Sequence, residues 1–279
     1  MNGKIEEIIL RHGQRGMQIL RDYLSPAWAE DAARAILGWK KGTVLLTTGF
    51  YVAGYAETDG PAGTMTLAKA LEQLGYHPVI VTDRFCEHFF ELKNLETVYV
   101  PMDAGTEDYR RILERFRPAG MISIERCGLN TEGDYANMRG ISIRENTARI
   151  DTLFDLAPDY SIETIGVGDG GNEIGMGNVA EIIAGKLSLV PCRTKTSYLV
   201  IASVSNWGAY GVTAYLSQLS GKDVFLSFSE IEQFIRDTVA IGSVDGITHE
   251  RISHVDGFDE AVEQEILDAL HAAIRPEEP

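Results

Sequence analysis

The stretch VLLTTG, residues 44–49, decides the fold class. A short apolar run that ends at a glycine is typical of a strand buried within a sheet. Similar runs recur along the chain, and segments with helical spacing of their apolar residues separate them. We expect the further strands at residues 78–82, 97–100, 120–124, 161–167 and 198–202.

Helical segments alternate with these strands, and two helices precede the first strand, within about residues 4–40. We expect the later helices at residues 67–75, 106–116, 212–219, 229–240 and 262–274. Ser229 and Glu232 have the spacing of a capping box for one of them. The alternation predicts an α/β protein with a mainly parallel sheet flanked by helices, in a Rossmann-like three-layer architecture. No linker or repeat interrupts it, so we expect a single domain over residues 1–279.

The composition argues against several classes of protein. The 25 Lys and Arg residues and 41 Asp and Glu residues give a formal net charge of −16, which is unfavourable for general nucleic-acid binding. No apolar run approaches the ~20 residues that a membrane-spanning helix needs. Three scattered cysteines form no C-x-x-C pair, which argues against a disulfide framework or a structural zinc site. Because Glu6 and Glu7 are also unlike a signal or transit peptide, we expect a cytoplasmic protein.

The stretch GVGDGGNEIGMGN at residues 166–178 is the densest cluster of glycine and polar residues. Its first glycines match the G-x-G-x-x-G pattern of dinucleotide-binding proteins, but the acidic residue expected about 20 positions later is missing. Asp169 and Glu173 would also place carboxylates where a pyrophosphate binds. Such acids suit a metal ion or an ammonium group better. The simpler interpretation is that Asp169 and Asn172 only cap turns and a helix.

A second polar loop follows the first strand. It carries Glu57 and Asp59, which suit a cation or the amine of a substrate. The backbone N–H groups of Gly63 and Thr64 open the next helix and could receive a carboxylate. The simpler interpretation is a tight loop exposed to solvent.

Two more loops follow strands. Glu125 and Arg126 come directly after residues 120–124, and either Arg126 or Arg139 could hold a carboxylate with two hydrogen bonds. An internal ion pair between Glu125 and Arg126 is the simpler interpretation. Near residue 206, Asn206 caps a helix or contributes to a site, and Trp207 could form one wall of a pocket. Since ligands bind beyond the carboxyl ends of parallel strands, we expect these loops to converge on one cleft.

Together these segments resemble the D-glutamate cyclase family. The resemblance is carried by GDGGNEIGMG at residues 168–177, with residues 48–50, 57–61, 125–126 and 206–208 in support. It extends from about Gly16 to the final helix. Members of the family convert D-glutamate to 5-oxo-D-proline and water, and in animals a similar domain is mitochondrial and fused to another domain.

The resemblance implies a hydro-lyase that acts on an acidic amino acid. Ring closure needs a base for the amine, a group that stabilises charge on the departing oxygen, and an anchor for the α-carboxylate. We assign catalysis to Asp169, Asn172 and Glu173. The expected substrate-binding residues are Glu57, Asp59, Gly63, Thr64, Glu125, Arg126, Arg139, Asn206 and Trp207.

Loss of water by ring closure moves no electrons, so we expect no organic cofactor. A divalent ion, Mg²⁺ or Mn²⁺, is an open option, with Asp169 and Glu173 as candidate ligands. Two other functions stay open: a non-catalytic α/β protein that binds an amino acid or a metal ion, and a dinucleotide-dependent oxidoreductase. The expected partner is a small molecule rather than a nucleic acid or a membrane, and a homo-oligomer stays open.

Overall fold

The computed structural model describes residues 4–275. Six parallel strands form one sheet in the order β5-β4-β1-β6-β7-β8. Their bounds are Thr43–Thr47 for β1, His77–Thr82 for β4, Glu96–Tyr99 for β5, Gly120–Ile124 for β6, Glu163–Gly168 for β7 and Tyr198–Ile201 for β8. The expected strands are therefore confirmed, each to within two residues at either end.

Helices connect and cover these strands. The α-helices are α1 Lys4–Ile9, α2 Met17–Leu20, α3 Trp28–Gly38, α4 Pro61–Gln73, α5 Thr106–Phe116, α6 Asp151–Leu156, α7 Ala180–Lys186, α8 Ser205–Ser220, α9 Phe228–Ile241 and α10 Glu260–Ile274. Short 3₁₀ turns lie at Arg21–Tyr23, Arg84–Cys86, Phe90–Lys93, Arg144–Asn146, Ala157–Tyr160 and Met176–Val179. None of the described helices is long and apolar enough to cross a membrane. The expected capping box is wrong by two residues, because Ser227 and Glu230 form it.

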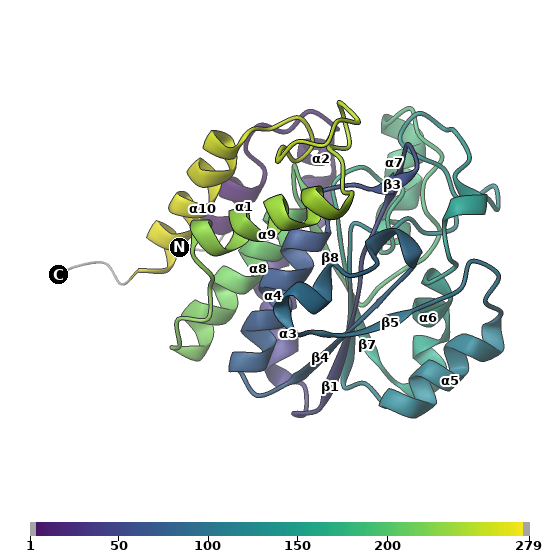
Figure 1. The fold of residues 1–279 in the computed structure, drawn as a ribbon, viewed down its shortest axis with the longest axis horizontal. Helices are drawn as coiled ribbons and strands as arrows, with labels where there is room; N and C mark the ends of the chain where they lie inside the picture. Colours follow the sequence, from purple (N-terminus) through teal and green to yellow (C-terminus); the bar gives the residue numbers. More distant parts are fainter. Residues whose placement is uncertain (1–3, 276–279) are drawn as a thin grey trace.

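The sheet lies between two layers of helices, as Figure 1 shows. Successive side chains of a strand point to opposite faces. Val44 and Leu46 therefore pack in the core that holds α1, α3, α4, α8 and α10, whereas Leu45 packs with residues of α5 and α6. Because both faces are covered, central strands such as β1 and β6 consist almost entirely of consecutive buried residues, which is why short apolar runs could locate them. The three-layer α/β architecture is confirmed.

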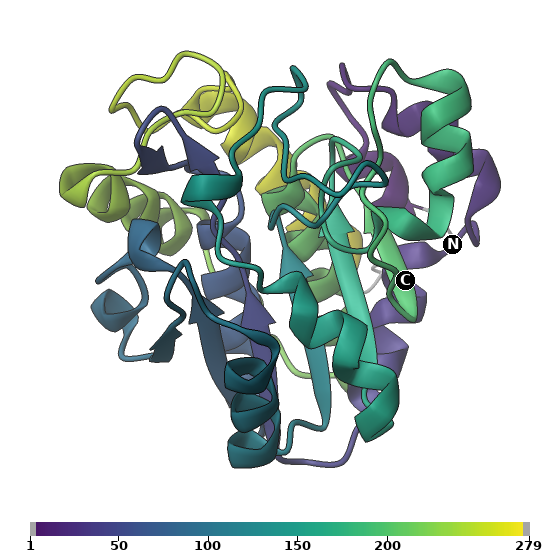
Figure 2. The same ribbon diagram turned by 90° about the vertical axis from the view of Figure 1, so that its right-hand side faces the viewer.

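The order of the strands reverses beside β1. The chain runs outward from β1 through β4 to β5, and then returns to add β6, β7 and β8 on the other side. Connections after β1 and β6 consequently diverge and leave a crevice at the carboxyl ends of these two strands, which is the usual ligand position in such sheets. Figure 2 shows the long loops of the chain gathered at this end of the sheet.

Glycines in the stretch 166–175 allow the chain to pack closely against its own loop. A Cβ atom on Gly166 would lie 2.4 Å from the carbonyl oxygen of Ile174 and 2.8 Å from the Cα atom of Gly175. The space beside Gly168 is filled by the side chains of Met176 and Glu173. The G-x-G-x-x-G match thus lets a loop fold back over β7, and we withdraw the dinucleotide interpretation.

We expect Gly166→Ala to destabilise the protein by about 1–3 kcal/mol, because backbone atoms of the loop must move to admit the methyl group. Gly185→Ala is the matched control, since nothing lies within 4 Å of its Cβ position in α7. This control should be neutral or stabilising by up to about 1 kcal/mol. Urea unfolding of both variants measures the difference, and equal stabilities would contradict the packing role of Gly166.

Candidate active site

A cleft of about 390 Å³ lies at the carboxyl ends of β1 and β6. The loop after β1 lines it and contains the small hairpin of β2 (Tyr51–Val52) and β3 (Tyr55–Ala56), which the sequence did not indicate. Further walls come from residues 137–146 and from the loop before α10. Its polar lining residues include Arg15, Glu57, Glu125, Asn137, Arg139 and Asn172.

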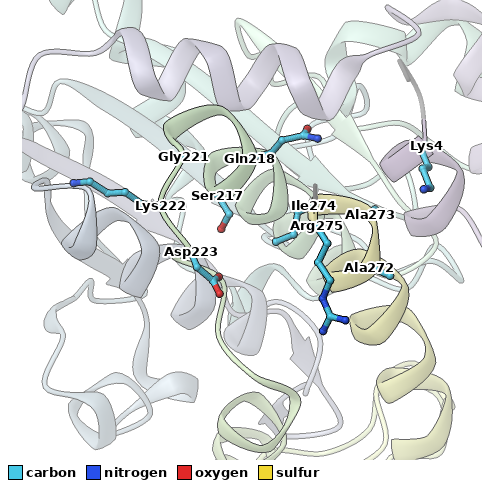
Figure 3. Close-up of a pocket in the computed structure, with 10 residues that line it drawn as sticks. All are labelled: Lys4, Ser217, Gln218, Gly221, Lys222, Asp223, Ala272, Ala273, Ile274 and Arg275. Atoms are coloured by element: carbon cyan, nitrogen blue, oxygen red, sulfur yellow. The ribbon is translucent and has the colours of Figure 1, made fainter. Parts of the chain in front are cut away.

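A larger cavity of about 570 Å³ lies at the other end of α8 (Figure 3). Ser217 in its wall follows Ser205 by twelve residues, or about 18 Å along the helix axis. Lys4, Lys222 and Asp223 are among its lining residues. Because the buried carboxylates gather at the opposite end of α8, the smaller cleft is the candidate active site.

Glu57 and Glu125 bring two carboxyl groups to the cleft. Glu125 directly follows β6 with a φ of 44°, a left-handed conformation that turns the chain sharply at the end of the strand. The Ser205 hydroxyl donates a 2.6 Å hydrogen bond to its Oε2 atom. Glu57 is fixed through its backbone, because its N–H group donates to the carbonyl oxygen of Phe50. Both side chains are buried yet line the cleft, which suits groups that meet a small ligand.

Arg15 links two further carboxylates at the edge of this cleft. Its Nη1 atom lies 2.7 Å from Oδ1 of Asp169, and its Nη2 atom lies 2.7 Å from Oδ1 of Asp256. Burial alone lowers the pKa of Arg15, but these carboxylates outweigh burial and the pKa lies well above its ordinary value. Arg15 therefore stays charged and joins the N-terminal segment, the β7 loop and the loop before α10.

Glu173 organises the glycine-rich loop. Its Oε1 atom accepts hydrogen bonds from the backbone N–H groups of Asp169 and Gly170, and its Oε2 atom accepts one from Gly171. Asn172 lines the cleft, where its amide nitrogen donates to the carbonyl oxygen of Ala136 and its Oδ1 atom has no partner. The loop is thus capped by Glu173, and the expectation that Asp169 and Asn172 only cap turns is wrong.

Asp59 and Asn206 exchange helix caps. The side chain of Asp59 accepts the N–H groups of Ser205 and Asn206 at the start of α8. In return, the Oδ1 atom of Asn206 accepts the N–H groups of Gly60 and Gly63 at the start of α4. Asn206 therefore caps α4 rather than its own helix. These two caps fix both helix N-termini beside the cleft.

This arrangement corrects the prediction for Gly63 and Thr64. The Gly63 N–H group is bound by Asn206, and the Thr64 N–H group donates to the carbonyl oxygen of Gly60. Neither group is free to receive a substrate carboxylate. We consequently remove both residues from the binding site.

Arg126 also has a different role from the expected one. Its guanidinium group is buried, pairs with Asp83 at 2.6 Å, and donates to the carbonyl oxygens of Gly49 and Ala148. Neither the predicted substrate clamp nor an ion pair with Glu125 is present among the described residues. Arg139 is exposed and lines the cleft, so it stays a candidate for a substrate carboxylate.

Trp207 does not form a wall of the cleft. It is fully buried, and its indole N–H group donates a 2.6 Å hydrogen bond to Glu263 of α10. The ring packs against Phe258 with the centroids 5.2 Å apart. Trp207 therefore ties α8 to the C-terminal part of the chain, and its predicted contact with substrate is withdrawn.

The three cysteines are free and buried. Burial raises the pKa of the Cys127 thiol well above its ordinary value, which keeps it protonated and unreactive. A cysteine nucleophile has no support at this site.

Burial raises the pKa values of several acidic side chains at the site. It raises the pKa values of Glu57 and Glu125 well above the ordinary range, and neighbouring carboxylates add to the effect. The pKa of Asp169 is likewise raised by burial, although Arg15 opposes the shift. Burial and the nearby Asp256 raise the pKa of Asp59 to about 8, against the helix N–H groups that it accepts. Perturbed carboxyl groups in a cleft are typical of catalytic sites.

Sequence reasoning missed Arg15 and Asp256. Both lie outside the alternation of strands and helices, Arg15 in the turn before α2 and Asp256 in the loop before α10. Neither belongs to a motif, and a basic and an acidic residue so far apart in the chain give no signal of pairing. The structure brings together the expected residues Glu57, Asp59, Asp169, Glu173 and Asn206, with Glu125 beside them, but not the guanidinium of Arg126.

These raised pKa values predict how stability depends on pH. The folded protein holds protons that the unfolded chain has released, so the associated stability is complete below the unfolded pKa values and is lost as pH rises through the folded ones. From about pH 5 to pH 8, the free energy of unfolding should fall by about 1.4 kcal/mol per pH unit for each extra proton held.

Chemical denaturation of chelator-treated protein across this pH range measures the trend. Glu125→Gln should flatten it, because one raised carboxyl group is removed while a carbonyl oxygen can still accept from Ser205. Asp223→Asn, at an exposed position, should leave the profile unchanged. Stability that increases toward pH 8 would contradict the raised pKa values.

The chain is similar to known proteins. A family model described as "D-glutamate cyclase-like, C-terminal" matches residues 5–271. The protein named "D-glutamate cyclase, mitochondrial" from Homo sapiens is 31% identical over 199 residues, which cover 62% of this chain and 32% of the human protein. The chain thus matches about a third of the length of that relative.

Solved structures give weaker likenesses. UDP-glucose 4-epimerase from Brucella ovis has 19% identity and a TM-score of 0.31, over 45% of this chain and 35% of that one. UDP-GlcNAc 2-epimerase from Methanocaldococcus jannaschii has 12% identity and a TM-score of 0.34, over 72% and 49%. Scores this low carry no functional argument. The family model, in contrast, spans the sheet, the cleft and nearly all the helices, and the chain belongs to the D-glutamate cyclase-like family.

Proposed function

We propose that this protein is a hydro-lyase that cyclises D-glutamate to 5-oxo-D-proline with release of water. The observation that carries the proposal is the meeting of Glu57, Glu125 and Arg15 at one small cleft at the sheet's switch point. Family membership supplies the reaction class, and the cleft supplies groups that suit each part of the substrate. We expect no organic cofactor, because the reaction transfers no electrons.

The polar lining of the cleft matches the charges of glutamate. The substrate ammonium group is placed between the carboxyl groups of Glu57 and Glu125, where Asn172 Oδ1 can accept one of its hydrogen bonds. The carboxylates are placed toward Arg15 and Arg139, which line the same cleft. Arg15 also contacts Asp169, so Asp169 positions the guanidinium group instead of meeting the substrate directly.

Glu125 is the proposed general base. In the proposed complex, the positive charge of the substrate ammonium group favours the ionised form of Glu125. The ionised carboxylate takes a proton from the ammonium group before the nitrogen attacks the γ-carbon, and its raised pKa makes it a stronger base. The hydrogen bond from Ser205 holds its carboxyl group in place. We accordingly move the catalytic assignment from Glu173 to Glu125, since both oxygens of Glu173 accept backbone N–H groups.

Glu57 is the proposed general acid. Its raised pKa lets it carry a proton near neutral pH, which it can donate to the γ-carboxylate oxygen that departs. The C–N bond forms as the C–O bond breaks. The ammonium nitrogen gives up two protons, and the departing oxygen gains two and leaves as water. The reaction is therefore balanced in protons, and the two glutamates only have to relay them.

The contacts also give a reason for selecting one enantiomer. Fixed sites for the amine, the α-carboxylate and the γ-carboxylate accept only one hand of the α-carbon. The other hand leaves a buried charged group unpaired, which costs several kcal/mol. The family resemblance, rather than this argument, assigns the preference to the D form.

We expect purified protein to form 5-oxoproline from D-glutamate and much less from L-glutamate. Glu125→Gln and Glu57→Gln should each lower kcat by about 10²-fold or more, because each removes a proton-transfer group. Glu132→Gln, at an exposed position, is the control and should retain activity. Chiral chromatography of 5-oxoproline, with and without Mg²⁺ or Mn²⁺, measures the product.

Absence of product from both enantiomers under all these conditions would refute the cyclase proposal. If D-glutamate nevertheless binds, as measured by calorimetry, the non-catalytic amino-acid-binding function would replace it.

Arg15 and Arg126 predict contrasting results for the same substitution. Arg15→Lys should raise KM for D-glutamate about tenfold or more, since one ammonium group cannot replace a guanidinium fork. Arg126→Lys should instead lower the melting temperature, because its contacts are with Asp83 and two backbone carbonyl groups. Steady-state kinetics and thermal unfolding of both variants distinguish the roles, and an unchanged KM in Arg15→Lys would remove Arg15 from the substrate site.

A further inference from the structure

Two carboxylate oxygens beside the cleft have no partner. Arg15 binds the Oδ1 atoms of Asp169 and Asp256, and both Oδ2 atoms are buried without a hydrogen bond. The side chain of Asp169 is entirely inaccessible to solvent, and that of Asp256 is 3% exposed. A buried carboxylate oxygen without a partner is costly, so these two atoms point to a ligand that supplies positive charge.

Asp59 lies beside these two residues, and we call Asp59, Asp169 and Asp256 the aspartate set. One carboxylate oxygen from each of Asp59, Asp169 and Asp256 lies within 4.8 Å of the others. In an octahedral site with ligands at about 2.1 Å, oxygens lie about 3.0 Å apart in cis positions and about 4.2 Å apart in trans positions. Oxygens within 4.8 Å of one another can converge on an ion of this size when their side chains move inward.

The local charges lead to the same conclusion. The three aspartates must be ionised to bind a metal ion. In that form, they and the guanidinium group of Arg15 sum to −2, since −3 + 1 = −2. A divalent cation would neutralise this group of residues. Arg15 can keep its contacts with the two Oδ1 atoms at the same time, as a residue that orients the ligands.

We propose that Asp59, Asp169 and Asp256 bind one divalent cation that prefers oxygen ligands, of the Mg²⁺ and Mn²⁺ class. The ion lies behind Arg15 at the edge of the cleft. Its binding does not depend on the proposed function, whereas its role in the reaction, to stabilise negative charge on the substrate, rests on that function.

A second set of acids also contains Asp169. Glu125, Asp169 and Glu173 have oxygens within the same 4.8 Å limit. Asp169 Oδ2 is the one buried oxygen without a partner in this set, among the described residues, whereas the aspartate set contains two. The aspartate set is therefore the better site, and Asp256 and Glu125 distinguish the two.

The experiment titrates chelator-treated protein with Mn²⁺ and follows the free ion by electron paramagnetic resonance, with no substrate present. We expect saturable binding of one Mn²⁺ per chain and competition by Mg²⁺. Asp256→Asn should weaken binding at least about tenfold, because a charged ligand is lost. Glu125→Gln should retain binding, and Asp223→Asn, an exposed control, should match the wild type.

Three results would overturn the proposal: no saturable binding to the wild-type protein, wild-type affinity in Asp256→Asn, or loss of binding in Glu125→Gln. If Asp256→Asn does not fold, as circular dichroism would reveal, the wild-type stoichiometry and the Glu125→Gln titration still decide. A protein that binds Mn²⁺ but forms no 5-oxoproline would refute the proposed function and leave the cation site intact.

Discussion

The exchange of helix caps between Asp59 and Asn206 is the interaction on which the site depends. Each residue satisfies the N–H groups of the other's helix, so α4 and α8 must begin at the same point beside the strand switch. The positive ends of both helix dipoles then face the region where the acids gather. Close approach at this point also explains Gly63, because a Cβ atom there would lie 2.9 Å from Ala209 and from the Cα atom of Asn206.

Burial of acidic side chains costs free energy, and neighbouring groups in this site partly offset that cost. Each carboxyl group withdrawn from water without full compensation either takes up a proton or needs a cation. Three kinds of group compensate the acids. Backbone N–H groups donate to Glu173, the Ser205 hydroxyl group donates to Glu125, and the guanidinium group of Arg15 pairs with Asp169. Different compensation gives neighbouring carboxyl groups different surroundings, and the proposed mechanism uses this difference to draw both an acid and a base from one cleft.

The sequence predicted the strands well because burial on both faces leaves a direct signal, a short apolar run. It also located most acids of the site, because parallel strands direct the loops after Thr48, Ile124 and Val167 to one edge. It failed where a partner came from elsewhere in the fold. Asp83 follows β4, a strand two places from β6, and no spacing rule reveals that it pairs with Arg126. Arg15 and Asp256 were missed for the same reason, since only folding brings the two ends of the chain together.

These errors share a physical cause that bears on function. An arginine next to a predicted site is readily interpreted as a clamp for a substrate carboxylate. A buried guanidinium group is costly, however, unless carboxylate and carbonyl partners surround it. Arg126 has such partners and is thereby committed to joining β6, the β1 loop and the segment before α6. Arg15 holds carboxylates whose second oxygens are unsatisfied, so its surroundings are incomplete. A buried ion pair such as that of Arg126 with Asp83 holds parts of the fold together. A group of acids left short of positive charge is instead maintained at the expense of stability, and in this chain that deficit lies beside the cleft.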